Sequence, residues 1–217
     1  MSGTTPRPAG PSTGRLLVLA GPSGVGKSHL VAGLRDAVPG LVFSVSATTR
    51  PPRKGEVAGR DYHFVDGDGF DALIARGELL EWAEVHGGLQ RSGTLREPVE
   101  RALAEGRPVL VEVDLQGARA VKAALPESLT VFIAPPSIAE LERRLTDRGT
   151  ESPAQRERRL QTAQEEMAAR PEFDVVVVND VLQDAVDRLV ELAVDRGEAG
   201  PAGSSRDSGP RVSTPSS

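Results

Sequence analysis

The sequence predicts an α/β fold in which helices flank a mostly parallel sheet. Three observations support this prediction. Five short apolar runs recur along the chain, at residues 16–20, 41–45, 109–111, 129–133 and 173–178. Their apolar residues are continuous rather than alternating, which is typical of strands covered on both faces. Segments with helical periodicity separate several of these runs, and a glycine-rich loop follows the first one.

Helices are predicted where capping residues precede periodic apolar positions. Ser137 and Glu140 form a capping-box pair at the start of one helix. Ser152 followed by Pro153 indicates the start of another, with proline at the first helical position. Residues 181–196 place apolar side chains on one face at a period of about 3.6, which predicts an amphipathic helix.

Composition indicates a globular protein and excludes several classes of site. The chain has 217 residues, of which 38% are hydrophobic, enough for one large domain or a domain with inserted subdomains. It contains no cysteine, which excludes disulfides, thiolate metal ligands and a cysteine nucleophile. The net charge of −5 argues against a nucleic-acid-binding surface, because such surfaces cluster excess cations.

The chain ends and the lengths of the apolar runs bear on location. No run approaches the roughly 20 residues of a membrane span, and the first residues lack a signal-peptide pattern. We therefore expect a soluble cytoplasmic protein that binds no membrane, with monomer and homodimer both open. Residues 1–13 and 198–217 are rich in Gly, Pro, Ser and Thr, so we expect two disordered tails around a folded domain of residues 14–197.

The glycine-rich segment after the first predicted strand carries the clearest chemical signal. It reads Gly21-Pro22-Ser23-Gly24-Val25-Gly26-Lys27-Ser28 and opens a helix-like stretch. In a phosphate-binding loop the glycines let successive N–H groups face one anion, the lysine reaches the terminal phosphates, and the serine hydroxyl can ligate Mg²⁺. A plain glycine-rich turn is the alternative, but the flanking strand and helix favour the phosphate loop.

Residues 46–92 break the alternation of strands and helices with short mixed runs and many polar and aromatic side chains. We interpret this region as a small subdomain inserted after the second strand. Arg50 and Arg53 lie on a segment stiffened by two prolines, and such a pair can grip one phosphate from two sides. Glu56 and Glu81 can accept hydrogen bonds from a donor edge such as guanine presents. A solvated charged loop is the alternative.

A carboxylate pair ends the third predicted strand. Successive side chains of a strand alternate between its faces, so Glu112 and Asp114, two residues apart, point the same way, toward the sheet edge where the phosphate loop is expected. An acidic residue in this position usually orders Mg²⁺, directly or through water. One of the two could instead cap the helix that starts at Leu115.

Arginines are concentrated over residues 143–159, where six are found. Arg144 and Arg148 share a helix face, and Arg159 could approach from the next helix. Arginines on a mobile helical segment suit phosphoryl transfer, because charge spreads over the transferred group and water must be excluded. Solvated helix faces explain some of the six.

Over about residues 14 to 196 these segments resemble guanylate kinase, in the order of that family. The shared motifs are the phosphate loop and residues 44–53, 55–62, 80–84, 113–117, 132–137, 148–150 and 178–180. The resemblance implies the P-loop kinase fold, with a GMP-binding subdomain at about 46–92 and a helical lid at about 143–170. It also implies Mg²⁺-dependent transfer of the γ-phosphoryl group of ATP to GMP or dGMP.

The resemblance further assigns roles to single residues. The ATP-binding set would be the phosphate loop with Arg144, Arg148 and Asn179, the last near the adenine. Mg²⁺ would bind with ATP at Ser28. The catalytic residues would be Lys27, Arg50, Arg148 and Arg159. The GMP-binding set would be Ser46, Arg50, Arg53, Tyr62, Glu81, Ser92, Glu112 and Asp114.

Two positions depart from the family's pattern. Many members have a tyrosine that contacts the GMP phosphate after the glutamate strand, whereas this chain offers Gln90, Arg91 or Ser92. Glu112 stands where aspartate is usual, so the carboxylate lies one methylene farther out.

Two other functions remain as alternatives. One is a non-catalytic guanylate-kinase-like module that binds phosphopeptides, but the intact Gly26-Lys27-Ser28 argues against it. The other is a kinase of the same fold that acts on a different phosphorylated sugar or nucleotide, which Glu81 and Asp114 disfavour.

Overall fold

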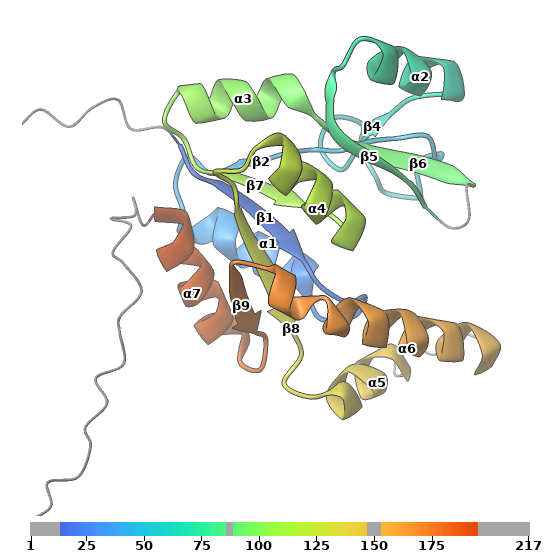
Figure 1. The fold of residues 1–217 in the computed structure, drawn as a ribbon, viewed down its shortest axis with the longest axis vertical. Helices are drawn as coiled ribbons and strands as arrows, with labels where there is room; N and C mark the ends of the chain where they lie inside the picture. Colours follow the sequence, from blue (N-terminus) through green and yellow to red (C-terminus); the bar gives the residue numbers. More distant parts are fainter. Residues whose placement is uncertain (1–13, 86–88, 147–152, 195–217) are drawn as a thin grey trace, which may run out of the picture.

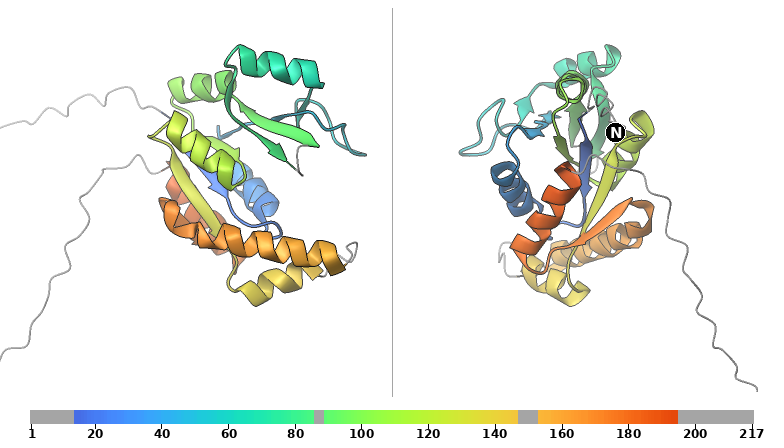
Figure 2. Two further views of the ribbon diagram at one scale, coloured as in Figure 1. Left: turned by 45° about the vertical axis from the view of Figure 1, so that its right-hand side comes forward. Right: turned by 90° about the vertical axis from the view of Figure 1, so that its left-hand side faces the viewer.

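The computed structural model describes residues 14–85, 89–146 and 153–194 of the chain (Figure 1). Within these ranges the strands form two sheets, one of five strands and one of four. The five-stranded sheet is parallel throughout, and helices cover both of its faces (Figure 2). The predicted α/β class with a parallel five-stranded sheet is confirmed.

The larger sheet has the strand order β2-β7-β1-β8-β9, with β1 (Leu16–Ala20) at its centre. Its other strands are β2 (Val42–Phe43), β7 (Val109–Glu112), β8 (Leu129–Ala134) and β9 (Val175–Val178). The helices around it are α1 (Lys27–Ala37), α3 (Arg96–Ala104), α4 (Leu115–Ala124), α5 (Ile138–Thr146), α6 (Pro153–Ala168) and α7 (Leu182–Val194). Among the described residues, no helix is long and apolar enough to cross a bilayer.

Every residue of β1 is buried, because the strand has a hydrophobic core on each side. Leu17 and Leu19 lie in the core formed with α1 and α7. Leu16, Val18 and Ala20 lie in the core formed with α3 and α4. Successive side chains of a strand point to opposite faces, so a strand with a core on both sides is apolar at every position.

The smaller sheet is built from the segment that breaks the alternation of strands and helices. Its order is β4-β3-β6-β5, with β3 (Ala47–Thr48), β4 (His63–Phe64), β5 (Leu79–Val85) and β6 (Gln90–Leu95). Between β4 and β5 lies α2 (Gly67–Ala75), whose Phe70 packs with Ala47 and Leu79 in a separate hydrophobic core. The segment therefore has its own core beside the larger sheet.

Two predicted strands are shorter than their apolar runs. The run at 41–45 contributes only β2, because the chain then leaves the larger sheet and joins the smaller one at β3. The run at 173–178 forms a strand only from Val175, after a 3₁₀ helix at Arg170–Glu172 that contains Pro171. The predicted helix at 181–196 is α7. The predicted tails lie outside the described residues.

Leu189 and Leu182 offer a matched test of the core on α7. Leu189 is 0% exposed and Leu182 is 46% exposed. We expect Leu189→Ala to lower the free energy of unfolding by about 3 kcal/mol, because a cavity replaces the buried side chain. Leu182→Ala should lower it by less than about 1 kcal/mol. Urea denaturation measures both variants, and equal losses would contradict this packing.

Candidate functional site

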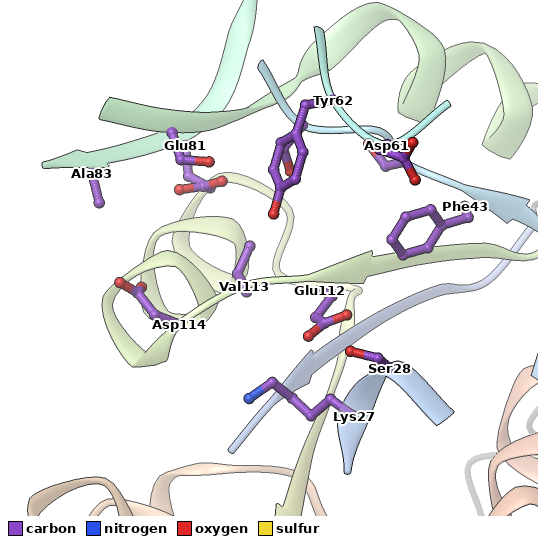
Figure 3. Close-up of a pocket in the computed structure, with 13 residues that line it drawn as sticks. Lys27, Ser28, Phe43, Asp61, Tyr62, Glu81, Ala83, Glu112, Val113 and Asp114 are labelled. Atoms are coloured by element: carbon purple, nitrogen blue, oxygen red, sulfur yellow. The ribbon is translucent and has the colours of Figure 1, made fainter. Parts of the chain in front are cut away.

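A cavity of about 360 Å³ lies between the two sheets, at the carboxyl edge of the larger one (Figure 3). The larger sheet and its loops contribute Lys27, Ser28, Phe43, Ser44, Glu112, Val113 and Asp114. The smaller sheet and its loops contribute Ser46, Asp61, Tyr62, Glu81, Ala83 and Ser92. Ligands of open α/β sheets bind at this edge, and the polar lining suits a ligand with charged and hydrogen-bonding groups.

The phosphate loop connects β1 to α1, which begins at Lys27. Gly26 has a φ of 96°, in the left-handed region, and a Cβ there would lie 2.6 Å from the side-chain nitrogen of Asn179. A Cβ on Gly21 would lie 2.4 Å from the carbonyl oxygen of Ile133. Backbone conformation and close packing therefore both require glycine in this loop, and the free N–H groups of the helix N-terminus follow directly behind it.

Lys27 has its ammonium group folded back onto the phosphate loop. Its Nζ donates to the carbonyl oxygen of Gly21 at 2.6 Å. Burial lowers the pKa of Lys27, while the carboxylates of Glu112, Glu166 and Asp114 act in the opposite direction. The ammonium carries three donors, so it can bind an incoming phosphate from this position.

Glu112 ends β7, and its carboxylate is directed toward Lys27 and the Ser28 hydroxyl (Figure 3). Burial raises the pKa of Glu112, and Lys27 opposes that shift. Carboxylate and hydroxyl oxygens are the hard ligands that Mg²⁺ prefers. The described residues contain no group of three or more His, Cys, Asp or Glu side chains that could hold a metal ion. An ion at this position would therefore need ligand phosphates as further partners.

Glu81 lies on β5, at the opposite end of the cavity from Lys27 (Figure 3). It is 8% exposed and accepts a hydrogen bond of 2.7 Å from the hydroxyl of Thr94 on β6. Burial raises the pKa of Glu81, and the charge of Asp114 adds to this shift. The site thus holds a buried acceptor whose orientation is fixed before any ligand binds.

Asp114 is the N-cap residue of α4 and does not continue β7. Its side chain accepts a 2.7 Å hydrogen bond from the Gly117 N–H, as an N-cap residue does. Of the two carboxylates that could have capped this helix, Asp114 is the one that does so. Its carboxylate also lines the cavity, on the side of Glu81 (Figure 3).

Arg50 and Tyr62 contact each other in the loops of the smaller sheet. The Arg50 guanidinium lies 4.6 Å from the centroid of the Tyr62 ring. Two of its nitrogens donate to the two Glu56 carboxylate oxygens at 2.6 and 2.7 Å, and the Arg53 backbone N–H donates to Glu56 at 2.7 Å. These bonds lower the pKa of Glu56 to about 2. Glu56 therefore binds arginine rather than facing a base edge, and none of these arginine side chains lines the cavity.

Ser46 and Ser92 both line the cavity. The Arg91 side chain contacts other residues instead. Its guanidinium lies 4.8 Å from the centroid of the Phe70 ring and forms an ion pair with Asp71. Of the three candidates at 90–92, Ser92 is the one whose side chain lines the cavity.

Of the three predicted lid arginines, Arg144 has a described side chain. It lies on α5, where its Nε donates to Glu140 at 2.8 Å and one Nη lies 3.5 Å from the carbonyl oxygen of Asn179. Arg159 lies in α6, of which only the backbone is described at that position. Arg148 lies outside the described residues.

Asn179 follows β9 and is 6% exposed. The family resemblance implies a position near the adenine of ATP. In the structure its side-chain amide donates to the Val25 carbonyl oxygen, inside the phosphate loop, at 2.7 Å.

Sequence patterns missed two residues that bear on this site. One is Thr94, whose contact with Glu81 depends on the pairing of β5 with β6. In that register Glu81 and Thr94 are opposite each other. Glu166 lies on α6, where burial raises its pKa while Lys27 and the backbone of Ser23 act in the opposite direction. Nothing in its polar helical surroundings marks Glu166 in the sequence.

Comparisons with known proteins agree with this geometry. Residues 13–195 match the family model for guanylate kinase. A guanylate kinase of Mycolicibacterium paratuberculosis is 62% identical over 192 residues, covering 88% of this chain and 85% of the relative. One of Rhodococcus jostii is 62% identical over 185 residues, covering 85% and 89%.

A solved structure supports the same assignment. The guanylate kinase of Anaplasma phagocytophilum superimposes with a TM-score of 0.66 at 34% identity, covering 84% of this chain and 85% of that one. The phosphate loop, the buried Glu81 and the sequence relatives therefore agree, and the chain belongs to the guanylate kinase family.

Proposed function

We propose that this protein transfers the γ-phosphoryl group of ATP to GMP, giving ADP and GDP, and that it also accepts dGMP. The observation that carries the proposal is the cavity between the two sheets. Lys27 and Ser28 of the phosphate loop lie at one end and the buried Glu81 at the other. One site can therefore hold donor phosphates and an acceptor base. Membership in the guanylate kinase family supports the same reaction.

Glu81 is proposed to select guanine. Its carboxylate can accept from the N1–H and N2–H₂ donors of guanine, whereas adenine lacks that pair. The 2.7 Å bond from Thr94 fixes the acceptor's orientation. Ser46 and Asp114 line the same cavity and would complete the contacts to the base.

The acceptor phosphate is proposed to bind Arg50, Arg53, Tyr62 and Ser92. Figure 3 shows the Tyr62 hydroxyl directed into the cavity. Glu56 already pairs with the two terminal nitrogens of Arg50, so a bound phosphate would have to share the donors of this guanidinium with Glu56. Because Arg50 and Arg53 do not line the cavity in this structure, the smaller sheet would have to close onto bound GMP.

ATP is proposed to bind at the phosphate loop. Lys27 and the loop amides would hold its phosphates, with Arg144, Arg148 and Arg159 closing over the transferred group. Ser28 and Glu112 have the oxygen ligands that would hold Mg²⁺ together with the ATP phosphates. The ion, when bound, neutralises charge on those phosphates.

The chain needs no nucleophile of its own. An oxygen of the GMP phosphate attacks the γ-phosphorus of ATP, and the bond from that phosphorus to the β–γ bridging oxygen breaks, releasing ADP. The protein aligns the two substrates, places positive charge around the transferred group and excludes water. We assign this reaction to purine nucleotide metabolism in the cytoplasm.

An ATP-coupled assay across GMP, dGMP, AMP, CMP and UMP tests the proposal. We expect turnover of GMP and dGMP only, because the other bases cannot satisfy the buried Glu81 acceptor. Preferred turnover of AMP would overturn the guanine assignment. No turnover with any nucleotide, together with retained GMP binding, would favour the non-catalytic phosphopeptide-binding module.

Lys27→Ala separates transfer from acceptor binding. We expect kcat to fall by about 100-fold or more, because charge on the transferred group loses a buried cation. GMP binding should change little, since Glu81 lies on β5 of the smaller sheet and Tyr62 in the loop before β4. Coupled kinetics and GMP calorimetry measure the two effects, and near-normal turnover would refute the role of Lys27.

Glu81 makes GMP binding pH-dependent. Burial raises its pKa above the ordinary value of 4.5, and binding requires the ionised form. We therefore expect GMP affinity to fall as the pH is lowered, starting at a higher pH than for an exposed carboxyl group. Glu81→Gln should weaken binding by about tenfold or more and remove this dependence.

The difference between the wild-type and Glu81→Gln pH profiles isolates the contribution of Glu81. The GMP phosphate titrates in the same way in both experiments, with a second pKa of about 6. Identical profiles for the two proteins would contradict the guanine-reading role.

A further inference from the structure

Asn179 is the only asparagine in the chain, and it joins the end of the sheet to the phosphate loop. Its Nδ2 donates to the Val25 carbonyl oxygen at 2.7 Å across 154 residues of sequence. Its own backbone N–H donates to the Ala134 carbonyl oxygen at 2.8 Å. The residue that holds the loop is thus anchored through its backbone to Ala134, where β8 and β9 end.

The bond to Val25 fixes the orientation of one peptide group. The Val25 carbonyl and the Gly26 N–H belong to the same planar trans peptide, so they point in opposite directions. With the carbonyl held by Asn179, the N–H is turned away from Asn179. Within the described part of the chain this N–H donates to no other group, so it is free to bind an anion.

Packing reinforces this orientation. A Cβ on Gly26 would lie 2.6 Å from the Asn179 side-chain nitrogen, so the two groups are in close contact. Gly26 is also the residue before α1, with a left-handed φ of 96° and no side-chain cap. Rotation of its peptide would break the buried bond to Asn179 and leave the Val25 carbonyl unsatisfied.

We propose that Asn179 is a positioning residue of the phosphate loop, which holds the Gly26 N–H toward the ATP phosphates. This role differs from contact with the adenine, because it acts on any ligand that carries the terminal phosphates. The inference deepens the proposed function and rests on it for the identity of the nucleotide. The hydrogen bond itself does not depend on the reaction.

The test compares ligands with and without a base. In Asn179→Leu, which keeps the volume and removes the donor, we expect the Kd of ADP and of inorganic pyrophosphate to rise by about tenfold each. The Kd of GMP should stay within about twofold, because its proposed contacts lie on other elements. Calorimetry on the full chain measures the three ligands, and Asn179→Ala provides a second variant if the leucine variant does not fold.

Gln183→Leu is the matched control. Gln183 is an exposed amide on α7 whose Nε2 donates to Asp187 of the same helix at 2.8 Å. Its loss should leave all three dissociation constants and kcat unchanged. A ligand-free readout is amide exchange over residues 21–28, which we expect to accelerate by about tenfold in Asn179→Leu and not in the control.

Each outcome decides the proposal. A loss for ADP with unchanged pyrophosphate binding would identify Asn179 as an adenine contact and overturn the positioning role. Equal losses for all three ligands would indicate a general structural defect and overturn it as well, as would unchanged loop exchange. The wild-type turnover assay tests the proposed function separately. If the wild-type protein did not phosphorylate GMP, the proposed function would fail, but the amide-exchange result for residues 21–28 would still test the role of Asn179.

Discussion

The site depends on charges that are removed from water and must be balanced locally. The same burial that lowers the pKa of Lys27 raises those of Glu81 and Glu112. An unpaired buried charge is costly, and each group therefore lies near a partner of opposite charge or a hydrogen-bond donor. The low effective dielectric constant of a buried site also strengthens the attraction between Lys27 and a phosphate.

Each of the two sheets positions a different part of the site. The larger sheet is packed on both faces and fixes the phosphate loop at the end of β1, where Gly21 and Gly26 allow no side chain. The smaller sheet, with its own hydrophobic core, carries on a hairpin and loops the groups that we propose to bind the acceptor nucleotide. Thr94 orients Glu81 in advance, so less ordering is needed when a ligand arrives. The division suits a reaction in which two nucleotides must meet.

Sequence and structure agree most closely where the signal is local. The phosphate loop was recognisable from eight consecutive residues, and the apolar runs at 16–20 and 129–133 became β1 and β8. The partners of Glu56 differ from those that its sequence position indicates. Its carboxylate was expected at a base edge, but Arg50 and the Arg53 amide bind it instead. Charge alone did not reveal which of several nearby cations it would meet.

The sequence by itself determined the parallel α/β class, the position of the phosphate loop and the carboxylates at its edge, because strand periodicity and loop chemistry are properties of short segments. Only the tertiary structure decided that Asp114 caps α4, that Ser92 rather than Arg91 lines the cavity, and that Asn179 holds Val25. These outcomes depend on strand register and on contacts between segments far apart in the chain. Such contacts are set by how the whole core packs, and no local pattern encodes them.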